Sequence, residues 1–199
     1  MAVTESKTLE LGSPAPDFAL PDTEGRVVRL ADLGAPVLVV VFMCNHCPYV
    51  KHVAPELARV ATDYLGRVAF VGISSNDVTE YPEDAPPEMA KERTRRGYPF
   101  PYLYDETQEV ARAYDAVCTP DLYVFDRERR LGYHGQLDET RPHRISSGNY
   151  DSSRAPAHGK DLRAALDALL EGRSPAREQR ASIGCSIKWK GQNGRDRRS

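Results

Sequence analysis

The stretch Val37–Val50 reads V-L-V-V-V-F-M-C-N-H-C-P-Y-V and joins an apolar run to a pair of cysteines. The β-branched and aliphatic residues of Val37–Phe42 are typical of a strand that is covered on both faces. Cys44 and Cys47 follow at Cys-x-x-Cys spacing, where apolar residues begin to recur with the period of a helix. A helix that starts here places both sulfurs at its positive end, where the thiolate is favoured over the thiol. Because the thiolate is the nucleophile, the stretch predicts redox chemistry.

Strands and helices alternate along the rest of the chain. The sequence predicts helices over residues 48–65, 85–97, 106–114 and 162–170, and strands over residues 68–74, 122–126 and 131–136. Two short strand-like pieces, 17–20 and 26–30, flank a turn and predict an N-terminal β-hairpin. Pro55 is expected to kink the first helix without ending it. Residues 140–159 are expected to form a long functional or mobile loop. This order predicts an α/β sandwich of three layers, with a mixed central sheet between helices.

The chain has 199 residues, which fits one domain with additions. We expect the domain to span residues 1–172 and a basic tail to span residues 173–199. The tail carries eight lysine and arginine residues against two acidic ones. Its apolar cluster Cys185–Trp189 is too hydrophobic for a free segment, so we expect the tail to dock in part on the acidic body.

Composition limits the partners. The whole chain has 27 basic and 29 acidic residues, which gives no footprint for nucleic acid or for a membrane surface. No apolar run approaches the roughly 20 residues that cross a bilayer, and residues 1–11 lack the apolar core of a signal peptide. We therefore expect a cytoplasmic protein. Four cysteines, two of them isolated, do not form a disulfide scaffold in a reducing compartment and are more typical of catalysis or metal binding.

The two cysteines of the motif can divide the work of disulfide exchange. The first, Cys44, is expected to be the nucleophile, and Cys47 is expected to resolve the mixed disulfide. His46, if protonated or donating to the sulfur, stabilises the reduced form of Cys44. The alternative is a metal site or a pair of buried thiols. A four-cysteine zinc site needs a second Cys-x-x-Cys, whereas the chain has only the isolated Cys118 and Cys185.

Thr119-Pro120 is a second marker, because it lies between a predicted helix and a predicted strand. A cis proline at this position can form a tight turn beside an active site, whereas an ordinary trans proline can also open a strand. The dipeptide alone does not decide between the two.

Together these segments resemble the thioredoxin superfamily, and the leading P-A-P-D-F of residues 14–18 resembles its redoxin, or AhpC/TSA, branch. The segments C-N-H-C-P-Y-V (44–50), S-N-D (75–77), C-T-P-D (118–121) and G-C-S-I-K-W (184–189) resemble a group of peroxiredoxin-like proteins of the thioredoxin family. The resemblance covers nearly the whole chain. It implies that Cys44 matches the thioredoxin nucleophile and that Pro120 is the cis proline facing it.

The sequence also departs from both families. Cys47 lies where the peroxidatic cysteine of peroxiredoxins falls, but Cys44 stands in place of their threonine, and no arginine lies near residues 119–121. A peroxide held only by backbone N–H groups would be poorly activated. The strand Val37–Phe42 also lacks the buried acid of thioredoxins, so another base must handle the proton of the resolving cysteine.

We therefore expect a thiol–disulfide oxidoreductase without a bound cofactor or metal. Its partners would be protein or small-molecule disulfides, with a reduced thiol protein or glutathione as electron donor; the oligomeric state stays open. Cys118 and Cys185 are candidate accessory redox thiols, each weighed against a purely structural role. Two alternatives remain: a thiol-dependent peroxidase with an antioxidant role, and a metal-binding or metallochaperone module that uses Cys44, Cys47 and a loop histidine.

Overall fold

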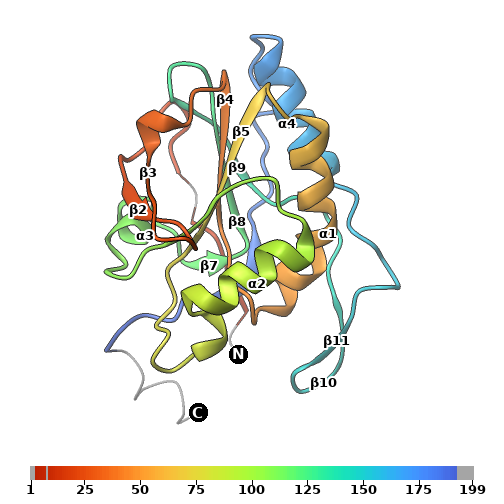
Figure 1. The fold of residues 1–199 in the computed structure, drawn as a ribbon. Helices are drawn as coiled ribbons and strands as arrows, with labels where there is room; N and C mark the ends of the chain where they lie inside the picture. The colour runs from red at the N-terminus through yellow and green to blue at the C-terminus, as the bar shows by residue number, and fades with distance from the viewer. Residues whose placement is uncertain (1–2, 8, 192–199) are drawn as a thin grey trace.

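A five-stranded mixed sheet forms the centre of the computed structural model, which describes residues 3–7 and 9–191 (Figure 1). The strands are β1 (Val3–Glu5), β2 (Ala19–Pro21), β3 (Val27–Arg29), β4 (Val37–Phe42), β5 (Val68–Ser74), β6 (Tyr102–Tyr104), β7 (Cys118–Thr119), β8 (Asp121–Phe125), β9 (Leu131–Gly135), β10 (His143–Ser146), β11 (Asn149–Asp151) and β12 (Ile183–Ser186). The helices are α1 (Pro48–Asp63), α2 (Pro86–Arg96), α3 (Glu109–Ala113) and α4 (Lys160–Leu170), with short 3₁₀ turns η1 (Leu30–Asp32) and η2 (Pro82–Asp84).

Strand β4 is the middle strand, as its unbroken apolar sequence predicts. The order in the sheet is β6-β5-β4-β8-β9, with β4, β5 and β6 parallel and β8 and β9 antiparallel. All six residues of β4 are buried. Its alternate side chains point into two separate apolar clusters, so each face of the sheet must be covered by its own layer of helices or loops.

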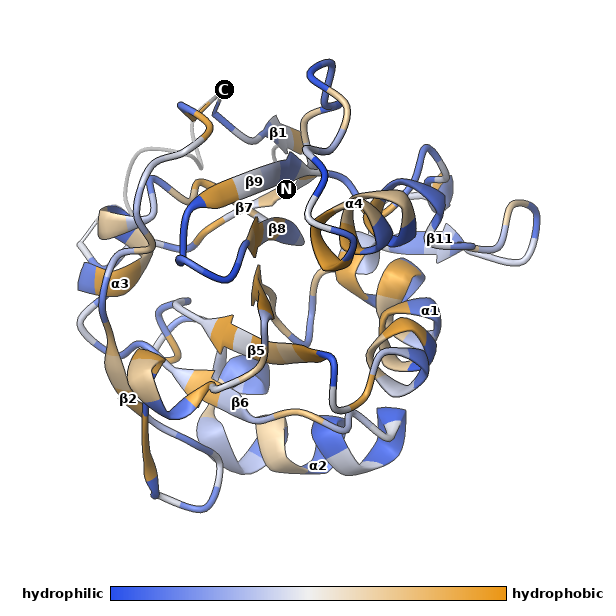
Figure 2. Ribbon diagram, turned by 90° about the horizontal axis from the view of Figure 1, so that it is seen from above, coloured by the Kyte–Doolittle hydropathy of each residue, from blue (hydrophilic) through white to orange (hydrophobic). Residues whose placement is uncertain are grey.

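The two covers make the three-layer sandwich that the sequence predicts. Val37, Val39 and Val41 pack in a cluster with apolar residues of α1, α2 and α4. Leu38 and Phe42 pack on the opposite side with residues of the β2 region and of α3. Figure 1 shows α1 and α4 on one side of the sheet and the β2–β3 hairpin with α3 on the other. Figure 2 shows the apolar residues of α1 turned toward the strands.

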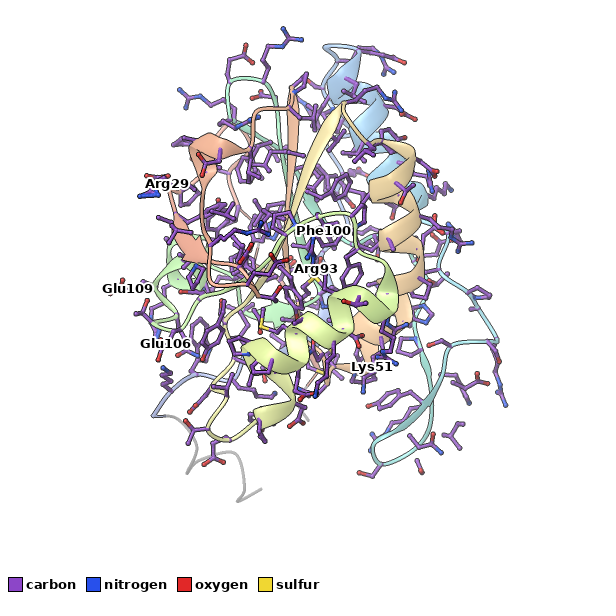
Figure 3. All side chains as sticks on the ribbon, viewed as in Figure 1. Arg29, Lys51, Arg93, Phe100, Glu106 and Glu109 are labelled. Carbon is purple, nitrogen blue, oxygen red and sulfur yellow. The ribbon has the colours of Figure 1, made fainter. Side chains whose placement is uncertain are left out.

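Two local predictions about the helices are confirmed. Helix α1 begins at Pro48 and continues past Pro55 to Asp63, as the unbroken apolar spacing indicates. Helix α2 ends before Gly97, whose φ of 66° is the left-handed conformation that glycine adopts at helix ends. After this turn the chain returns along α2, where Arg93 Nε donates to Phe100 O at 3.1 Å (Figure 3).

The segment 140–159 is more regular than the predicted loop. It contains the antiparallel hairpin β10–β11, which projects from the body in Figure 1. The strands are short, and every residue of β10 is exposed. A hairpin of this kind lacks the alternation of apolar and polar residues from which strands are predicted, so the sequence gives no signal for it.

The C-terminal segment adds a small second sheet of order β1-β12-β7. Beyond β12, Ile187 N donates to Val117 O at 2.9 Å and Lys188 N donates to Asn76 Oδ1 at 2.8 Å. The Trp189 ring lies under the Arg112 guanidinium at 4.6 Å. The predicted boundary at residue 172 stays a prediction, although the chain beyond it shares a sheet with the body. Residues 192–199 of the predicted tail lie outside the described residues.

Gly184 fits β12 closely against β7. A Cβ at Gly184 would lie 1.9 Å from the backbone oxygen of Thr119, far inside contact distance. We predict that Gly184→Ala lowers the free energy of unfolding by about 1–3 kcal/mol, because the strand must move off its partner. Denaturant titration measures this loss. Gly34→Ala is the matched control, because a Cβ at Gly34 meets nothing within 4 Å; equal midpoints for the two variants would contradict the prediction.

None of the helices within residues 3–7 and 9–191 is long and apolar enough to cross a membrane.

Candidate active site

Both cysteines of the motif lie in the loop that joins β4 to α1. The helix begins at Pro48, so Cys47 is its N-cap residue, and Cys44 precedes it by three residues. Both side chains are buried, with 1% of Cys44 and none of Cys47 exposed. All four cysteines of the chain are thiols in the structure. Only Cys47 is therefore placed at the positive end of α1, in contrast to the expectation for the pair.

The surroundings of Cys47 favour the thiolate. Burial, the largest single effect, opposes the charge. The thiols of Cys185 and Cys44, together with the backbone N–H groups of Val50 and Cys185, donate hydrogen bonds that outweigh it and hold the pKa of Cys47 well below its usual value. As a thiol, Cys47 donates to Thr119 O at 3.1 Å.

The surroundings of Cys44 favour the protonated thiol. Burial, the hydrogen bond with Cys47 and the negative charge of Asp84 raise the pKa of Cys44 well above its usual value. A weaker contact acts in the other direction, because Cys44 Sγ lies 3.4 Å from Thr119 Oγ1. The pKa values of the two neighbours are therefore shifted in opposite directions. The order expected from the sequence, with Cys44 as the nucleophile, stays a prediction.

His46 faces a carboxylate instead of a sulfur. Its Nδ1 lies 2.6 Å from Asp84 Oδ2, and its ring stacks on Tyr81 with centroids 4.9 Å apart. His46 Nε2 is buried without a hydrogen-bond partner among the described residues. The expected hydrogen bond from His46 to Cys44 is therefore absent, because Asp84 orients the ring.

Asp84 is the site residue that the sequence reasoning missed. It lies in η2 and is completely buried. Its Oδ1 accepts the backbone N–H groups of Asn45 and His46, and its Oδ2 accepts Asn76 Nδ2 as well as the His46 ring. The carboxylate thus fixes the backbone between the two cysteines. The sequence marks Asp84 only as an acidic residue that follows the S-N-D segment (75–77) of the resemblance.

One group of donors in the described part of the chain has the composition of a metal site. A donor atom from each of Cys44, His46 and Asp84 lies within 4.8 Å of the others. The carboxylate already accepts four hydrogen bonds, however, and a carboxylate offers about four lone-pair positions. A metal would have to displace two of these bonds. Of the metal ligands expected from the sequence, Cys44 and a loop histidine, here His46, belong to this group, whereas Cys47 does not.

The turn at Thr119–Pro120 joins the two sulfurs to the rest of the fold. The peptide bond between these residues is cis, in agreement with the resemblance. Thr119 meets Cys44 through its hydroxyl and Cys47 through its carbonyl. The geometry thus brings the two cysteines and the turn together, although they are more than 70 residues apart in the chain.

The two isolated cysteines differ in their placement. Cys185 on β12 shares a hydrogen bond with the Cys47 sulfur, and this bond, followed by burial, raises the pKa of Cys185. Cys118 on β7 is buried with its Sγ 3.9 Å from Pro120 O. Burial and the negative charges nearby raise the pKa of Cys118, so it is a poor nucleophile. The structure thus favours a packing role for Cys118, whereas Cys185 belongs to the site.

The lowered pKa of Cys47 gives a measurable pH dependence. A thiolate absorbs in the ultraviolet, so the difference in absorbance between wild type and Cys47→Ser reports this thiol without requiring access to it. We predict a midpoint below the ordinary value of about 8.5. The sign for stability follows: the contribution of Cys47 is fully present above the ordinary pKa and is lost as the pH falls through the lowered one. A midpoint at or above the ordinary value would contradict the assignment.

Comparisons with known proteins point to redox families. The AhpC/TSA family model matches residues 11–134. An uncharacterized conserved protein from Geobacillus kaustophilus, of known crystal structure, is 54% identical, with 96% of this chain and 98% of that chain covered and a TM-score of 0.88. A Mycobacterium tuberculosis protein that carries the name putative peroxiredoxin is 29% identical over 121 residues, which are 61% of this chain and 73% of that protein. The thiol-disulfide oxidoreductase ResA of Geobacillus thermodenitrificans is 27% identical over 135 residues, with 64% and 70% covered.

Proposed function

Because the chain belongs to the AhpC/TSA family, we propose that it is a thiol–disulfide oxidoreductase whose Cys44–Cys47 pair cycles between dithiol and disulfide. The observation that carries this proposal is the contact of two thiols with opposite pKa shifts beside a cis proline. One sulfur is ready to attack, and its neighbour keeps a proton until it is needed. The relatives named as a peroxiredoxin and as a thiol-disulfide oxidoreductase support a redox function.

The geometry favours Cys47 as the attacking sulfur. Its thiolate attacks one sulfur of a substrate disulfide, forms a mixed disulfide and releases the other substrate sulfur as a thiolate. Cys44 then loses its proton and attacks Cys47 Sγ. The Cys44–Cys47 disulfide forms, and the substrate leaves as a dithiol with two more electrons. The substrates we propose are protein or small-molecule disulfides, and a reduced thiol protein or glutathione returns the pair to the dithiol.

Asp84 and His46 supply the base that the sequence reasoning left unassigned. Cys44 must lose a proton in the second step, and the buried strand beside it carries no acid. A donor atom of the His46 ring and an oxygen of Asp84 lie within 4.8 Å of the Cys44 sulfur. His46 Nε2 is buried without a hydrogen-bond partner in the described part of the chain, so the ring can take up the proton while Asp84 stabilises the resulting charge.

Equilibration of the protein with mixtures of reduced and oxidised glutathione tests this function. After acid quenching and alkylation of the free thiols, peptide mapping identifies each disulfide. We expect Cys44–Cys47 to appear reversibly as the potential rises, together with the reduction of insulin disulfides by the reduced protein. The proposal fails if this disulfide never forms and insulin is not reduced.

Thiol peroxidase activity is the second candidate, because Cys47 is a helix-terminal thiolate. Within residues 3–7 and 9–191, however, the groups that shift the pKa of Cys47 most include no arginine. A peroxide without a positively charged partner is poorly activated. We therefore expect peroxide loss, followed with a thiol donor, to be slow compared with disulfide exchange. Faster turnover of peroxide than of disulfides would favour the peroxidase.

Metal binding is the candidate from another class. Elemental analysis of the dialysed protein distinguishes it from the redox function, because a stoichiometric metal would occupy the Cys44, His46 and Asp84 donors. We expect less than one equivalent. The cytoplasmic location also stays a proposal, and cell fractionation tests it.

A further inference from the structure

Cys47 touches two thiols, only one of which belongs to the Cys-x-x-Cys motif. Cys44 and Cys185 both share hydrogen bonds with its sulfur. Cys185 lies 138 residues further along the chain, on β12, and is 3% exposed. The attacking sulfur of the proposed function therefore has two candidate partners for a disulfide, one on each side.

The position of Cys185 is fixed by strand pairing. β12 runs antiparallel to β7, with Cys185 opposite Thr119, the residue that accepts from Cys47. Gly184 packs directly on the Thr119 carbonyl, where a Cβ has no room. Before Cys185 in the chain, Ser182 Oγ donates to Gly135 O at 2.7 Å. After Cys185, the backbone N–H of Ile187 donates to Val117 O and holds the end of the strand. The contact between the two sulfurs is therefore a built feature of the fold.

We infer that Cys185 is a third redox thiol of this site, which forms a disulfide with Cys47 in exchange for the one between Cys44 and Cys47. The inference rests on the proposed function, because that function supplies the first disulfide. It adds a residue, a second disulfide and a role for the C-terminal strand.

The exchange needs no further oxidant. Cys185 Sγ loses its proton and attacks Cys47 Sγ, the Cys44–Cys47 bond breaks, and the Cys47–Cys185 bond forms. Cys44 leaves as a thiolate and takes up a proton, as its raised pKa favours. One disulfide is present before and after, so the electrons balance. Reduction by glutathione or by a thiol protein returns both sulfurs to thiols.

The second disulfide would fasten β12 over the site. In the dithiol state only hydrogen bonds and packing hold the strand on β7, whose edge beside the cis proline is thereby covered. An extended substrate segment could pair with that edge only after β12 had moved aside. The Cys47–Cys185 bond would prevent this movement and keep the oxidised protein closed until it is reduced.

Disulfide mapping of cysteine variants tests the inference. Full-length wild type, Cys44→Ser, Cys185→Ser and Cys118→Ala are equilibrated with glutathione mixtures under native conditions, quenched with acid, alkylated and mapped. We expect Cys44→Ser to form Cys47–Cys185 within one chain. Cys185→Ser should form only Cys44–Cys47, and wild type should divide Cys47 between the two partners. Cys118→Ala is the matched control, because Cys118 lies on the neighbouring strand, and it should map like wild type.

Two outcomes overturn the inference. If Cys47 in Cys44→Ser is recovered only as a thiol or joined to glutathione, while Cys185 is alkylated, then Cys185 is not a redox thiol. If Cys47–Cys185 forms no faster in the native protein than in denaturant, the pairing does not arise from the folded site. In either case a reversible Cys44–Cys47 disulfide in Cys185→Ser leaves the proposed function intact, whereas its absence from every variant refutes that function instead.

Discussion

Cys47→Ser will reduce thiol–disulfide exchange to the background rate, whereas the double variant Cys44→Ser/Cys185→Ser will retain the attack and stop at the mixed disulfide. The two variants differ because only Cys47 caps α1 and carries a lowered pKa. Loss of the nucleophile removes the first step, and we expect a drop on the order of 10³-fold or more. Loss of Cys44 and Cys185 removes only the second step.

Insulin reduction measures the first effect, and mass spectrometry of the trapped complex measures the second. Each variant is mixed with a model peptide that contains a disulfide, and the reaction is quenched with acid. The mass of the intact protein is then measured by mass spectrometry. We expect Cys44→Ser/Cys185→Ser, which lacks both candidate resolving thiols, to accumulate a covalent adduct on Cys47 and Cys47→Ser to accumulate none. The opposite pattern, with an adduct on Cys44, would restore the order predicted from the sequence. Cys118→Ala serves as the control for the removal of a buried thiol near the site.

The fold could be predicted because its main signals are local. The apolar run of β4, the helical spacing through Pro55 and the turn inside the N-terminal hairpin each determine an element without distant contacts. The hairpin β10–β11 gave no such signal, because its strands are short and exposed. Patterns of apolar residues predict buried elements and say little about those that project from the body.

The site could be predicted only in part. The sequence identifies Cys44, Cys47 and the Thr119–Pro120 turn, because spacing and residue type carry that information. It predicts the start of the helix at residue 48, but it does not show which groups donate hydrogen bonds to each sulfur. The contacts of Asp84 with His46 and of Cys185 with Cys47 span 38 and 138 residues of chain. Neither follows from any local pattern.

Asp84→Asn will lower the free energy of unfolding more than any other substitution at this site that replaces one group of atoms. The Asp84 carboxylate is completely buried and accepts four hydrogen bonds, two of them from the backbone between the cysteines. An asparagine side chain offers one oxygen and turns an NH₂ group toward the remaining donors. With the NH₂ group toward the loop, the backbone N–H groups of Asn45 and His46 lose their partner. With the NH₂ group toward Asn76 and the His46 ring, Asn76 Nδ2 loses its partner and the ring must change its tautomer. We expect the free energy of unfolding to fall by about 3 kcal/mol.

The same substitution has a chemical readout that a loss of packing would not give. The negative charge of Asp84 contributes to the raised pKa of Cys44, so its removal should lower that pKa. In Cys47→Ser, where Cys44 is the only cysteine of the motif, the thiolate absorbance of Cys44 should then appear at lower pH when Asp84→Asn is added.

Glu83→Gln is the matched control, because it removes the same charge one residue earlier from an exposed side chain. We expect it to change neither the unfolding midpoint nor the titration of Cys44. If Asp84→Asn and Glu83→Gln unfold at the same denaturant concentration, the carboxylate does not hold the loop between the cysteines. If Asp84→Asn unfolds earlier but leaves the Cys44 titration unchanged, Asp84 is a structural anchor alone, and the proton of Cys44 must go to another base.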